Sequence, residues 1–449
     1  MKTRALFLAL ALPLAAAEAQ DLLATYELAL QHDPRLRQAE ANRNAVLETR
    51  PQSIAQLLPT LSVTGQMNRN SLLIKQLSPA TAAIQGGAGQ ITRNFFNLNF
   101  WNSSASINLT QPIYHHELWV QLSQADNQVA QAEATYAAEQ QNTGLRTAQA
   151  YFNVLLAQDN LEFAQAEKQA IERQLEQAKA RFEVGLIAIT DVNEAQAAYD
   201  QARASEIKAQ NDLDNAREAL REIIGEFDEK LSALATEFIL DSPQPANIDD
   251  WAERAQQNNL AIIAAQNQAE QAKKGIDLQF AGHLPTLDLI GSAGFTDTNR
   301  PRTPTNESAV IGMQVNVPLF QGGGVNSRVR QARHEFEAAQ ENLDTQRRAV
   351  TRQVKDAYRG VLSSISQVAA LKAAVVSSQS ALEAAEAGFE VGTRTMVDVL
   401  IEQRNLYQAK RNYAQARYDY IINSLSLKQA ASMLRLEDIE LVNRWLSRS

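Results

Sequence analysis

The sequence of 449 residues contains no cysteine and only 6% aromatic residues, and its mean hydropathy is −0.32. Without cysteine, the chain can form neither a disulfide bond nor a thiolate metal site. The low mean hydropathy excludes a bundle of membrane-spanning helices. The net charge of −9 argues against nucleic acid as a partner, because the phosphate backbone attracts basic surfaces. The length of the chain favours several structural units over one compact core.

Catalytic motifs are also missing. The sequence has no P-loop, no G-x-S-x-G nucleophile motif and no H-E-x-x-H zinc motif. The pair His115-His116 lies at a predicted strand-to-helix junction, where we do not expect metal binding. The run Gly322-Gly323-Gly324 lacks the Lys and Ser or Thr of a phosphate loop, so a turn with unusual backbone angles explains it better. We therefore expect a protein that is not an enzyme and has no cofactor and no metal site.

The N-terminus has the pattern of a secretory signal. Lys2 and Arg4 precede an apolar run over residues 5–17, which ends in the small-residue site Ala17-Glu18-Ala19. The run is too short to span a bilayer, which takes roughly 20 apolar residues. Residues 1–19 are therefore predicted to be a cleaved signal peptide, which places the mature chain outside the cytoplasm.

One short stretch occurs twice, first as Arg181–Val192 and again as Gly388–Val399. Phe389 lies 207 positions after Phe182, and Asp398 lies 207 positions after Asp191. In each copy a Gly interrupts a helical pattern, which is typical of a helix C-cap. The Asp that follows is typical of the start of a return helix, where a carboxylate accepts hydrogen bonds from free N–H groups. Each stretch is therefore predicted to be the tip of a helical hairpin.

The two halves of the chain repeat the same order of strands and helices. Alternating apolar and polar residues predict four strands, at 58–68, 105–112, 284–291 and 309–318. The apolar alternation slips near Trp101-Asn102, which favours a β-bulge there, and residues 69–96 have the composition of an exposed loop. Long helical patterns cover about 117–182 and 325–387, each roughly 95 Å at 1.5 Å per residue, with return helices at 190–224 and 396–434.

Four strands with one apolar face cannot stand alone in lipid, because every backbone polar group there needs a partner and the sheet must close. Outer-membrane barrels have at least about eight strands. Two chains would give 8 strands with little lumen, and three would give 12 strands around an aqueous channel. A soluble periplasmic coiled-coil adaptor is the alternative; it explains the hairpins and the signal peptide but not the four alternating strands.

The chain resembles the TolC family of outer-membrane channel-tunnels, the outer membrane factors of efflux and type I secretion. The resemblance covers nearly all of the mature chain and is strongest in Arg181–Asp200, His283–Gly291 and Gly388–Val399. It implies a mixed α and β fold, in which three chains share a 12-stranded transmembrane β-barrel that is continued by a periplasmic α-helical barrel. The implied segments are a signal peptide (1–19), an N-terminal helix and equatorial region (20–56), a first barrel hairpin (57–112), a first long helical hairpin (113–224), an equatorial linker and helix (225–282), a second barrel hairpin (283–320), a second long helical hairpin (321–434) and a C-terminal equatorial segment (435–449).

The resemblance also implies roles for the tips of the hairpins, in a passive duct gated at its periplasmic end. Gating contacts are expected from Asp191, Thr190, Arg394 and Phe389, where the family often has Tyr in place of Phe389. Asp398 is expected to form an acidic ring that can bind polyvalent cations; Ile401 replaces a second Asp found in relatives. The implied partners are two further copies, a periplasmic adaptor (membrane fusion protein), an inner-membrane pump and outer-membrane lipid. The expected adaptor-docking residues are Val184, Gly185, Leu186, Val391, Gly392 and Thr393.

Overall fold

The computed structural model describes residues 19–79, 91–227, 230–236, 238–300 and 303–446. The chain forms two compact units. The helical unit comprises Met1–Arg43, Gln131–Gln266 and Asn342–Ser449, and the strand unit comprises Asn44–Ala130 and Asn267–Glu341. The predicted signal peptide falls, apart from Ala19, outside the described residues.

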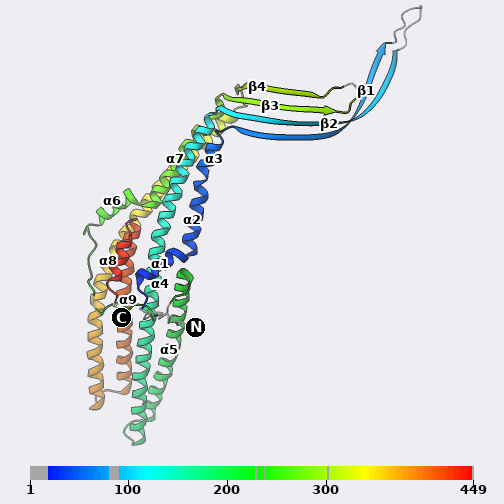
Figure 1. The fold of residues 1–449 in the computed structure, drawn as a ribbon. Helices are drawn as coiled ribbons and strands as arrows, with labels where there is room; N and C mark the ends of the chain where they lie inside the picture. Colours follow the sequence, from blue (N-terminus) through cyan, green and yellow to red (C-terminus); the bar gives the residue numbers. More distant parts are fainter. Residues whose placement is uncertain (1–18, 80–90, 228–229, 237, 301–302, 447–449) are drawn as a thin grey trace, which may run out of the picture. The chain divides into compact units, whose positions relative to one another are not determined.

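The strand unit contains a four-stranded antiparallel sheet in the order β1-β2-β3-β4 (Figure 1). The strands are β1 (Thr60–Pro79), β2 (Ile91–Tyr114), β3 (Thr286–Thr298) and β4 (Asn306–Asn316). The first strand of the second half pairs with the second strand of the first half, with Asn102 opposite Thr298. The two hairpins predicted from the repeat therefore form one continuous sheet.

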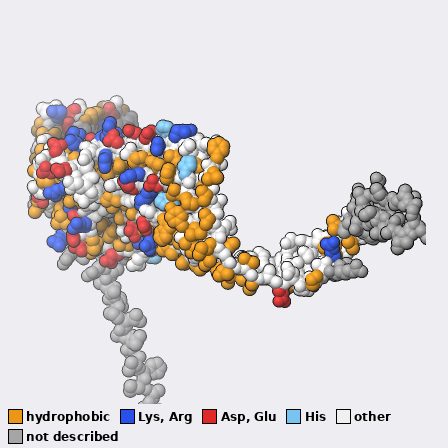
Figure 2. Space-filling view, turned by 90° about the horizontal axis from the view of Figure 1, so that it is seen from above, with side chains coloured by type: hydrophobic (Ala, Val, Ile, Leu, Met, Phe, Trp, Pro, Cys, Tyr) orange, Lys and Arg blue, Asp and Glu red, His pale blue; other side chains and the backbone are white. Residues whose placement is uncertain are grey.

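One face of this sheet is hydrophobic and uncovered. Leu61, Val63 and Met67 of β1 and Ile311 and Met313 of β4 are each at least 66% exposed. Neighbouring polar residues bond across the strands, as Thr64 Oγ1 and Ser106 Oγ do at 2.8 Å. Few charged side chains lie on the part of the sheet visible in Figure 2. The alternation in the sequence thus produces one apolar face and one polar face.

The structure corrects two predictions in this region. Residues 69–79 and 91–96 belong to strands and not to a loop, since the ladder continues from Arg69 opposite Trp101 to Pro79 opposite Ile91. In this part of the ladder backbone hydrogen bonds join the strands, and the side chains do not alternate between apolar and polar. The composition therefore wrongly indicated a loop. The predicted bulge near Trp101 is also wrong. The register between β2 and β3 shifts instead between Pro112 and Tyr114, because proline has no N–H to donate to the ladder.

The helical unit is built around two long hairpins. The first consists of α4 (His116–Glu183) and α5 (Ile189–Ile224), and the second of α8 (Gly324–Glu390) and α9 (Met396–Ala430). Both α4 and α8 begin in the strand unit. The shorter helices of the chain are α1 (Leu22–His32), α2 (Pro34–Leu47), α3 (Thr49–Ala55), α6 (Ile248–Asn258), α7 (Leu260–Phe280), the short 3₁₀ helix η1 (Ala281–His283) and α10 (Leu436–Asn443).

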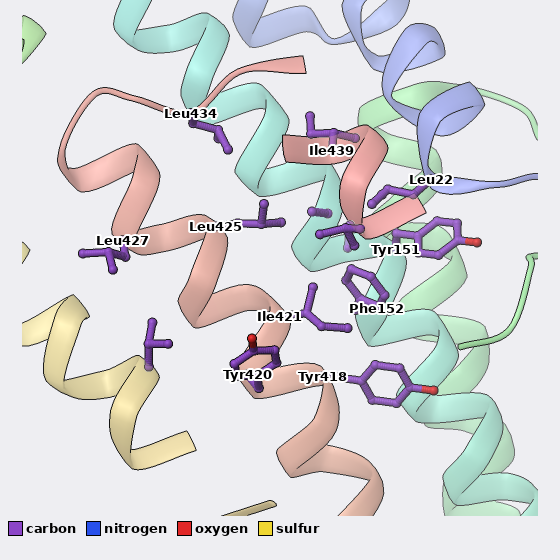
Figure 3. Close-up of a cluster of buried hydrophobic side chains, with 14 of the residues drawn as sticks. Leu22, Tyr151, Phe152, Tyr418, Tyr420, Ile421, Leu425, Leu427, Leu434 and Ile439 are labelled. Atoms are coloured by element: carbon purple, nitrogen blue, oxygen red, sulfur yellow. The ribbon is translucent and has the colours of Figure 1, made fainter. Parts of the chain in front are cut away.

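The main core of the helical unit lies between α4 and α9. Phe152 of α4 faces Ile421 of α9, and Tyr151 beside it lies next to Leu22 of α1, with Ile439 of α10 in the same cluster (Figure 3). The ring of Phe152 lies 5.7 Å from that of Tyr418, whose hydroxyl donates to Asp159 at 2.8 Å. Burial and the nearby carboxylate of Asp159 raise the pKa of Tyr418, so this hydroxyl stays a donor.

Polar contacts join neighbouring long helices, which are seen in the order α8, α9, α4, α5 in Figure 1. Asn423 of α9 donates to Ser364 of α8 at 2.7 Å. Arg411 of α9 pairs with Glu167 of α4 at 2.8 Å. Lys168 of α4 pairs with Glu206 of α5 at 2.8 Å. Near the tips α5 also packs directly on α9, so that α4, α5 and α9 meet there.

Candidate hairpin-tip gate

The two hairpin tips have the same backbone geometry. Gly185 has φ 78° and Gly392 has φ 77°, values that favour glycine. The N–H of Gly185 donates to the carbonyl of Phe182 at 2.9 Å, and the N–H of Gly392 donates to the carbonyl of Phe389 at 3.2 Å. These bonds connect residues that are equivalent under the 207-residue repeat. The predicted helix C-caps are confirmed at both tips.

The apolar residues around both glycines are open to solvent. Val184 is 68% exposed, Leu186 is 73% exposed and Val391 is 74% exposed. Apolar side chains held outward on a rigid turn are typical of a protein–protein contact site. The tips therefore offer hydrophobic surface that the described chain itself does not cover.

The two tips lie at the same end of the helical unit. Met396 and Leu400, at the start of α9, share one hydrophobic cluster with Val192 and Ala195, at the start of α5. Phe389, at the end of α8, packs both on this cluster and on a second cluster within the α8–α9 hairpin. Phe389 thus adds to the packing between the two hairpins that Met396 and Leu400 also make.

Arg181 covers Phe389 from the neighbouring hairpin, a contact that the sequence did not predict. The guanidinium carbon lies 4.7 Å from the centre of the ring. A cation over an aromatic face is attracted by the quadrupole of the ring. The family resemblance implied that position 389 lacks the hydroxyl of the Tyr that relatives often have. The structure shows that the cation of Arg181 lies over the Phe389 ring instead.

Arg394 and Asp191, the expected gating pair, lie on different hairpins. Within the chain, Arg394 Nη1 is 4.0 Å from Asp398 Oδ1; the side chain of Arg394 is exposed and that of Asp398 is half-buried. No ion pair joins Arg394 to Asp191 among the described residues. Asp191 and Thr190 belong to the first turn of α5, whose N-cap residue Ala188 makes no side-chain hydrogen bond. Asp191 therefore lies at the start of the return helix as predicted, but no backbone N–H donates to its carboxylate among the described residues, so the predicted capping bond is not seen.

Asp398 caps the start of α9. Its carboxylate accepts hydrogen bonds from the N–H and the hydroxyl of Thr395, both at 2.8 Å, and the hydroxyl of Thr395 accepts from the N–H of Asp398 at 3.3 Å. This reciprocal arrangement is a capping box. Hydrogen bonds from the backbone and side chain of Thr395, together with the charge of Arg394, lower the pKa of Asp398. Asp398 is therefore ionised at neutral pH, and its predicted capping role is confirmed.

A groove of about 930 Å³ runs from the tips along the helical unit. Its walls come from α5 and α9, and α4 contributes Asn160, Glu167 and Ile171. Glu194 and Arg404 are among its charged lining residues. A groove with helical walls of mixed character suits a partner helix better than a small molecule.

His115 bonds with two carboxylates at the junction of β2 and α4. His115 Nδ1 lies 2.8 Å from Glu117 Oε1, and its Nε2 lies 2.9 Å from Asp288 Oδ1, so both ring nitrogens are occupied. Across the part of the chain that the structure describes, no group of three or more His, Cys, Asp or Glu residues could hold a metal ion. Gly322 and Gly323 have φ 61° and 78°, which confirms an unusual turn at the strand-to-helix junction.

Comparison with known proteins defines the class. The family model described as outer membrane efflux protein matches residues 25–226 and 251–432, two segments that each contain one helical hairpin. The chain belongs to this family of outer-membrane channels. It is 41% identical to the outer membrane protein TolC of Vibrio cholerae serotype O1 over 433 residues, which cover 95% of this chain and 94% of that protein. It is 39% identical to TolC of Escherichia coli K12, with coverage of 96% and 86%.

Solved structures agree with this fold. The CmeC outer membrane channel of Campylobacter jejuni superposes with a TM-score of 0.77 at 16% identity, covering 96% of this chain and 90% of that one. VceC of Vibrio cholerae gives a TM-score of 0.73 at 20% identity, covering 92% and 96%. The predicted family and the predicted combination of long helical hairpins with four strands are confirmed. The chain is an outer-membrane channel protein with a periplasmic helical extension, and its relatives are channels, not enzymes.

Proposed function

We propose that three copies of this chain close a 12-stranded barrel in the outer membrane and form a passive exit duct. The observation that supports this is the four-stranded sheet, in which β1 and β4 each pair on one side only among the described residues. Its hydrophobic face is exposed, as lipid contact requires. Four strands are too few for a barrel, and unpaired backbone groups are not tolerated in hydrocarbon, so copies must share their strands.

The duct serves drug efflux, type I protein secretion or both. Two types of relative support this breadth. The alkaline protease secretion protein AprF of Pseudomonas aeruginosa is 28% identical over 94% of this chain, and the cobalt-zinc-cadmium resistance protein CzcC of Cupriavidus metallidurans is 25% identical over 63%. A passive pore supplies no energy, so an inner-membrane pump drives transport through a periplasmic adaptor. The adaptor binds at the tips, on the exposed residues Val184, Leu186 and Val391 and the turn glycines Gly185 and Gly392.

The hairpin tips form the gate of this duct. Arg394 has an exposed guanidinium that reaches Asp191 and Thr190 of the first hairpin of a neighbouring copy, and a guanidinium on a carboxylate forms a directional, charge-assisted bond. A pair at an exposed site is worth about 1 kcal/mol or less, so an adaptor can release it. Phe389, held under Arg181, supports the closed arrangement from within each chain.

Single-channel recording in planar bilayers tests this proposal. The purified full-length protein should form trimers in detergent and give a small conductance, and Arg394→Ser should give a larger one. Arg404→Ser, at a second exposed Arg in the helical part of the second hairpin, is the control and should leave the conductance unchanged. A monomer that inserts no pore would overturn the duct, whereas a pore unaffected by Arg394→Ser would overturn only the gate.

Asp398 supplies the carboxylate ring at the constriction. With Ile401 in place of a second acidic residue, three chains contribute one ring, which attracts cations through its charge. Trivalent cations added on the periplasmic side should block the pore weakly, and Asp398→Asn should abolish the block. Block that persists in Asp398→Asn would place the cation site elsewhere.

A further inference from the structure

The segment between β4 and α8 carries exposed apolar side chains at the end of the sheet from which the long helices start. Leu319 is 92% exposed and Phe320 is 87% exposed. Ile113 and Tyr114, at the same point in the first half of the chain, are 50% and 42% exposed. Figure 2 shows hydrophobic side chains gathered at this end of the sheet. Apolar and aromatic residues at the end of lipid-facing strands mark the boundary of the hydrocarbon core.

Arginines follow directly after this boundary. Arg328, Arg330 and Arg333 lie in the first three turns of α8, and all three are exposed. None of them forms an ion pair within the described part of the chain. The sequence has no Asp or Glu between Glu307, at the start of β4, and Glu335. The start of α8 therefore presents positive charge that the described chain does not neutralise.

The other half of the repeat does not have this charge. The N-terminal end of a helix favours acidic side chains, and α4 follows this rule with Glu117 in its first turn. The first turn of α8 contains no acidic residue. The residues that lie 207 positions before the three arginines are Gln121, Ser123 and Asp126. The basic start of α8 is therefore not a requirement of the shared architecture, and it indicates an anionic ligand outside the chain.

Arg328 also lines a pocket of about 270 Å³ beside the end of the sheet. Gln279 of α7 and Gln321 are part of its wall, and their amides can donate hydrogen bonds. Glu117 lines the pocket as well, but its carboxylate lies 2.8 Å from the ring of His115. The pocket thus combines a guanidinium that has no ion pair with neutral donors. This set of groups suits a single phosphate group.

The positions of the arginines along α8 match the headgroup region of a bilayer. Arg328, Arg330 and Arg333 lie 4, 6 and 9 residues after the start of α8, which is roughly 6 to 14 Å at 1.5 Å per residue. The headgroups extend roughly 5 to 8 Å beyond the hydrocarbon core on each side. Charges act over roughly 8 Å more at physiological salt. Arg328 and Arg330 therefore lie at the level of lipid phosphates, and Arg333 lies within range of their charge.

We propose that the start of α8 binds an anionic phospholipid in the periplasmic leaflet of the outer membrane. The acyl chains lie on Leu319 and Phe320, the phosphate occupies the pocket beside Arg328, and Arg330 and Arg333 attract further headgroups. The ligand is a lipid and not a free anion, because exposed apolar side chains and unpaired cations follow each other in the chain. This inference rests on the proposed barrel, and it adds which class of lipid the periplasmic rim selects.

Lipid titration of the purified full-length trimer tests this inference. Phosphatidylglycerol or phosphatidylcholine with the same acyl chains is added in detergent, and bound lipid is counted by native mass spectrometry. The wild type should bind phosphatidylglycerol at least tenfold more tightly than phosphatidylcholine. Each arginine at an anionic lipid surface contributes roughly fivefold to binding. The triple variant Arg328→Gln/Arg330→Gln/Arg333→Gln should therefore lose the preference and remain trimeric.

Two matched variants separate the position of the charges from their number and from the apolar part. Arg347→Gln/Arg348→Gln/Arg352→Gln removes three arginines of the same helix roughly 35 to 40 Å from its start, and it should keep the preference. Leu319→Ser/Phe320→Ser should weaken the binding of both lipids. Glycerol phosphate, which has a phosphate but no acyl chain, should not compete with phosphatidylglycerol at equal concentration.

The outcomes that overturn the lipid site differ from those that overturn the duct. A wild-type trimer that binds both lipids equally, or a first triple variant that keeps the preference, would overturn the lipid site and leave the duct intact. Competition by glycerol phosphate would replace it with a site for free anions. Loss of the trimer in the first triple variant alone would assign the arginines to a contact between copies. A wild-type protein that is monomeric and inserts no pore would overturn the duct itself.

Discussion

The guanidinium of Arg181 lies 4.7 Å above the ring of Phe389, so the last turn of α4 in one hairpin covers the last turn of α8 in the other. Phe389 also packs on the hydrophobic clusters of both hairpins. Apolar packing and the cation therefore hold this ring from different directions. A movement of one tip away from the other breaks the cation–ring contact, because Arg181 and Phe389 belong to different hairpins.

We predict that Arg181→Ala destabilises the closed tips. A cation–aromatic contact at a partly exposed site is worth about 0.5–1 kcal/mol, and each copy in a ring loses one. The measurable result is a higher open probability in planar bilayers. Lys179→Ala removes an exposed cation of the same helix end that contacts no ring, and it should behave like the wild type.

A double-mutant cycle gives a sharper answer. If the effect runs through the ring, Arg181→Ala should have little further influence once Phe389→Leu has removed the aromatic face. Fully additive effects of the two substitutions would show that Arg181 acts through another contact.

The exposed tips should be sensitive to charge. We predict that Leu186→Asp abolishes export in cells and leaves trimer formation intact, since Leu186 is 73% exposed and a charge there costs the fold little. Substitution of Gly185 is a poorer probe, because its φ of 78° makes any side chain strained. Ile239→Asp, at another exposed apolar position in the linker, is the control. Normal export by Leu186→Asp would place adaptor docking elsewhere, and the groove between α5 and α9 would be the next candidate.

The return helices of the two hairpins differ in their N-cap residues, and each N-cap can be substituted by the other. Thr395 caps α9 through its hydroxyl, whereas Ala188, the equivalent residue under the repeat, gives α5 no side-chain bond. Thr395→Ala should destabilise the first turn of α9 by about 1 kcal/mol, and Ala188→Thr should stabilise the first turn of α5 by a similar amount with Asp191 as the third helical residue. Hydrogen exchange of peptides from each turn measures this, with changes of about fivefold in opposite directions. Equal exchange in wild type and variants would show that caps do not limit opening of the tips.

One glycine of the sheet is required by close packing. A Cβ at Gly294 would lie 2.5 Å from the carbonyl oxygen of Ala105 and 2.8 Å from Cβ of Ser106, both on the neighbouring strand β2. Gly294→Ala should therefore separate β3 from β2 and lower the yield of heat-resistant trimers. Gly312→Ala is the matched control on β4, since its Cβ would have nothing within 4 Å. Equal yields from the two variants would contradict the register of β2 and β3.

Periodicity and repetition in the sequence were sufficient to predict the helices, the tips and the existence of the strands. Gly185 and Gly392 could be predicted as helix ends because a C-cap is a local property of a few residues. The true length of β1 and β2 could not, because their outer parts are held by backbone pairing that leaves no trace in side-chain alternation. The contact between Arg181 and Phe389 joins residues of two hairpins and depends on how the helices pack, so no local pattern reports it.

The last prediction concerns pH and His115, which joins the end of β2 to β3. Its two ring nitrogens lie 2.8 Å from Glu117 and 2.9 Å from Asp288. Burial lowers the pKa of His115, but hydrogen bonds with the two carboxylates and their charges outweigh this effect, so the pKa is raised overall. A raised folded-state pKa means that the charged ring adds stability below its ordinary pKa of about 6.5 and loses that contribution as pH rises through the folded value.

His115→Gln should therefore lower the unfolding temperature of the detergent-solubilised protein at pH 6 more than at pH 9. After screening by solvent, the pH-dependent part should be about 1 kcal/mol per chain. His334→Gln is the control, because His334 pairs with Glu337 at 2.9 Å on an exposed helix surface where such a pair contributes little. The two variants should differ at pH 6 and converge at pH 9. If His115→Gln shifted the unfolding temperature equally at both values, the ring would act through packing or neutral hydrogen bonds and not through its charge.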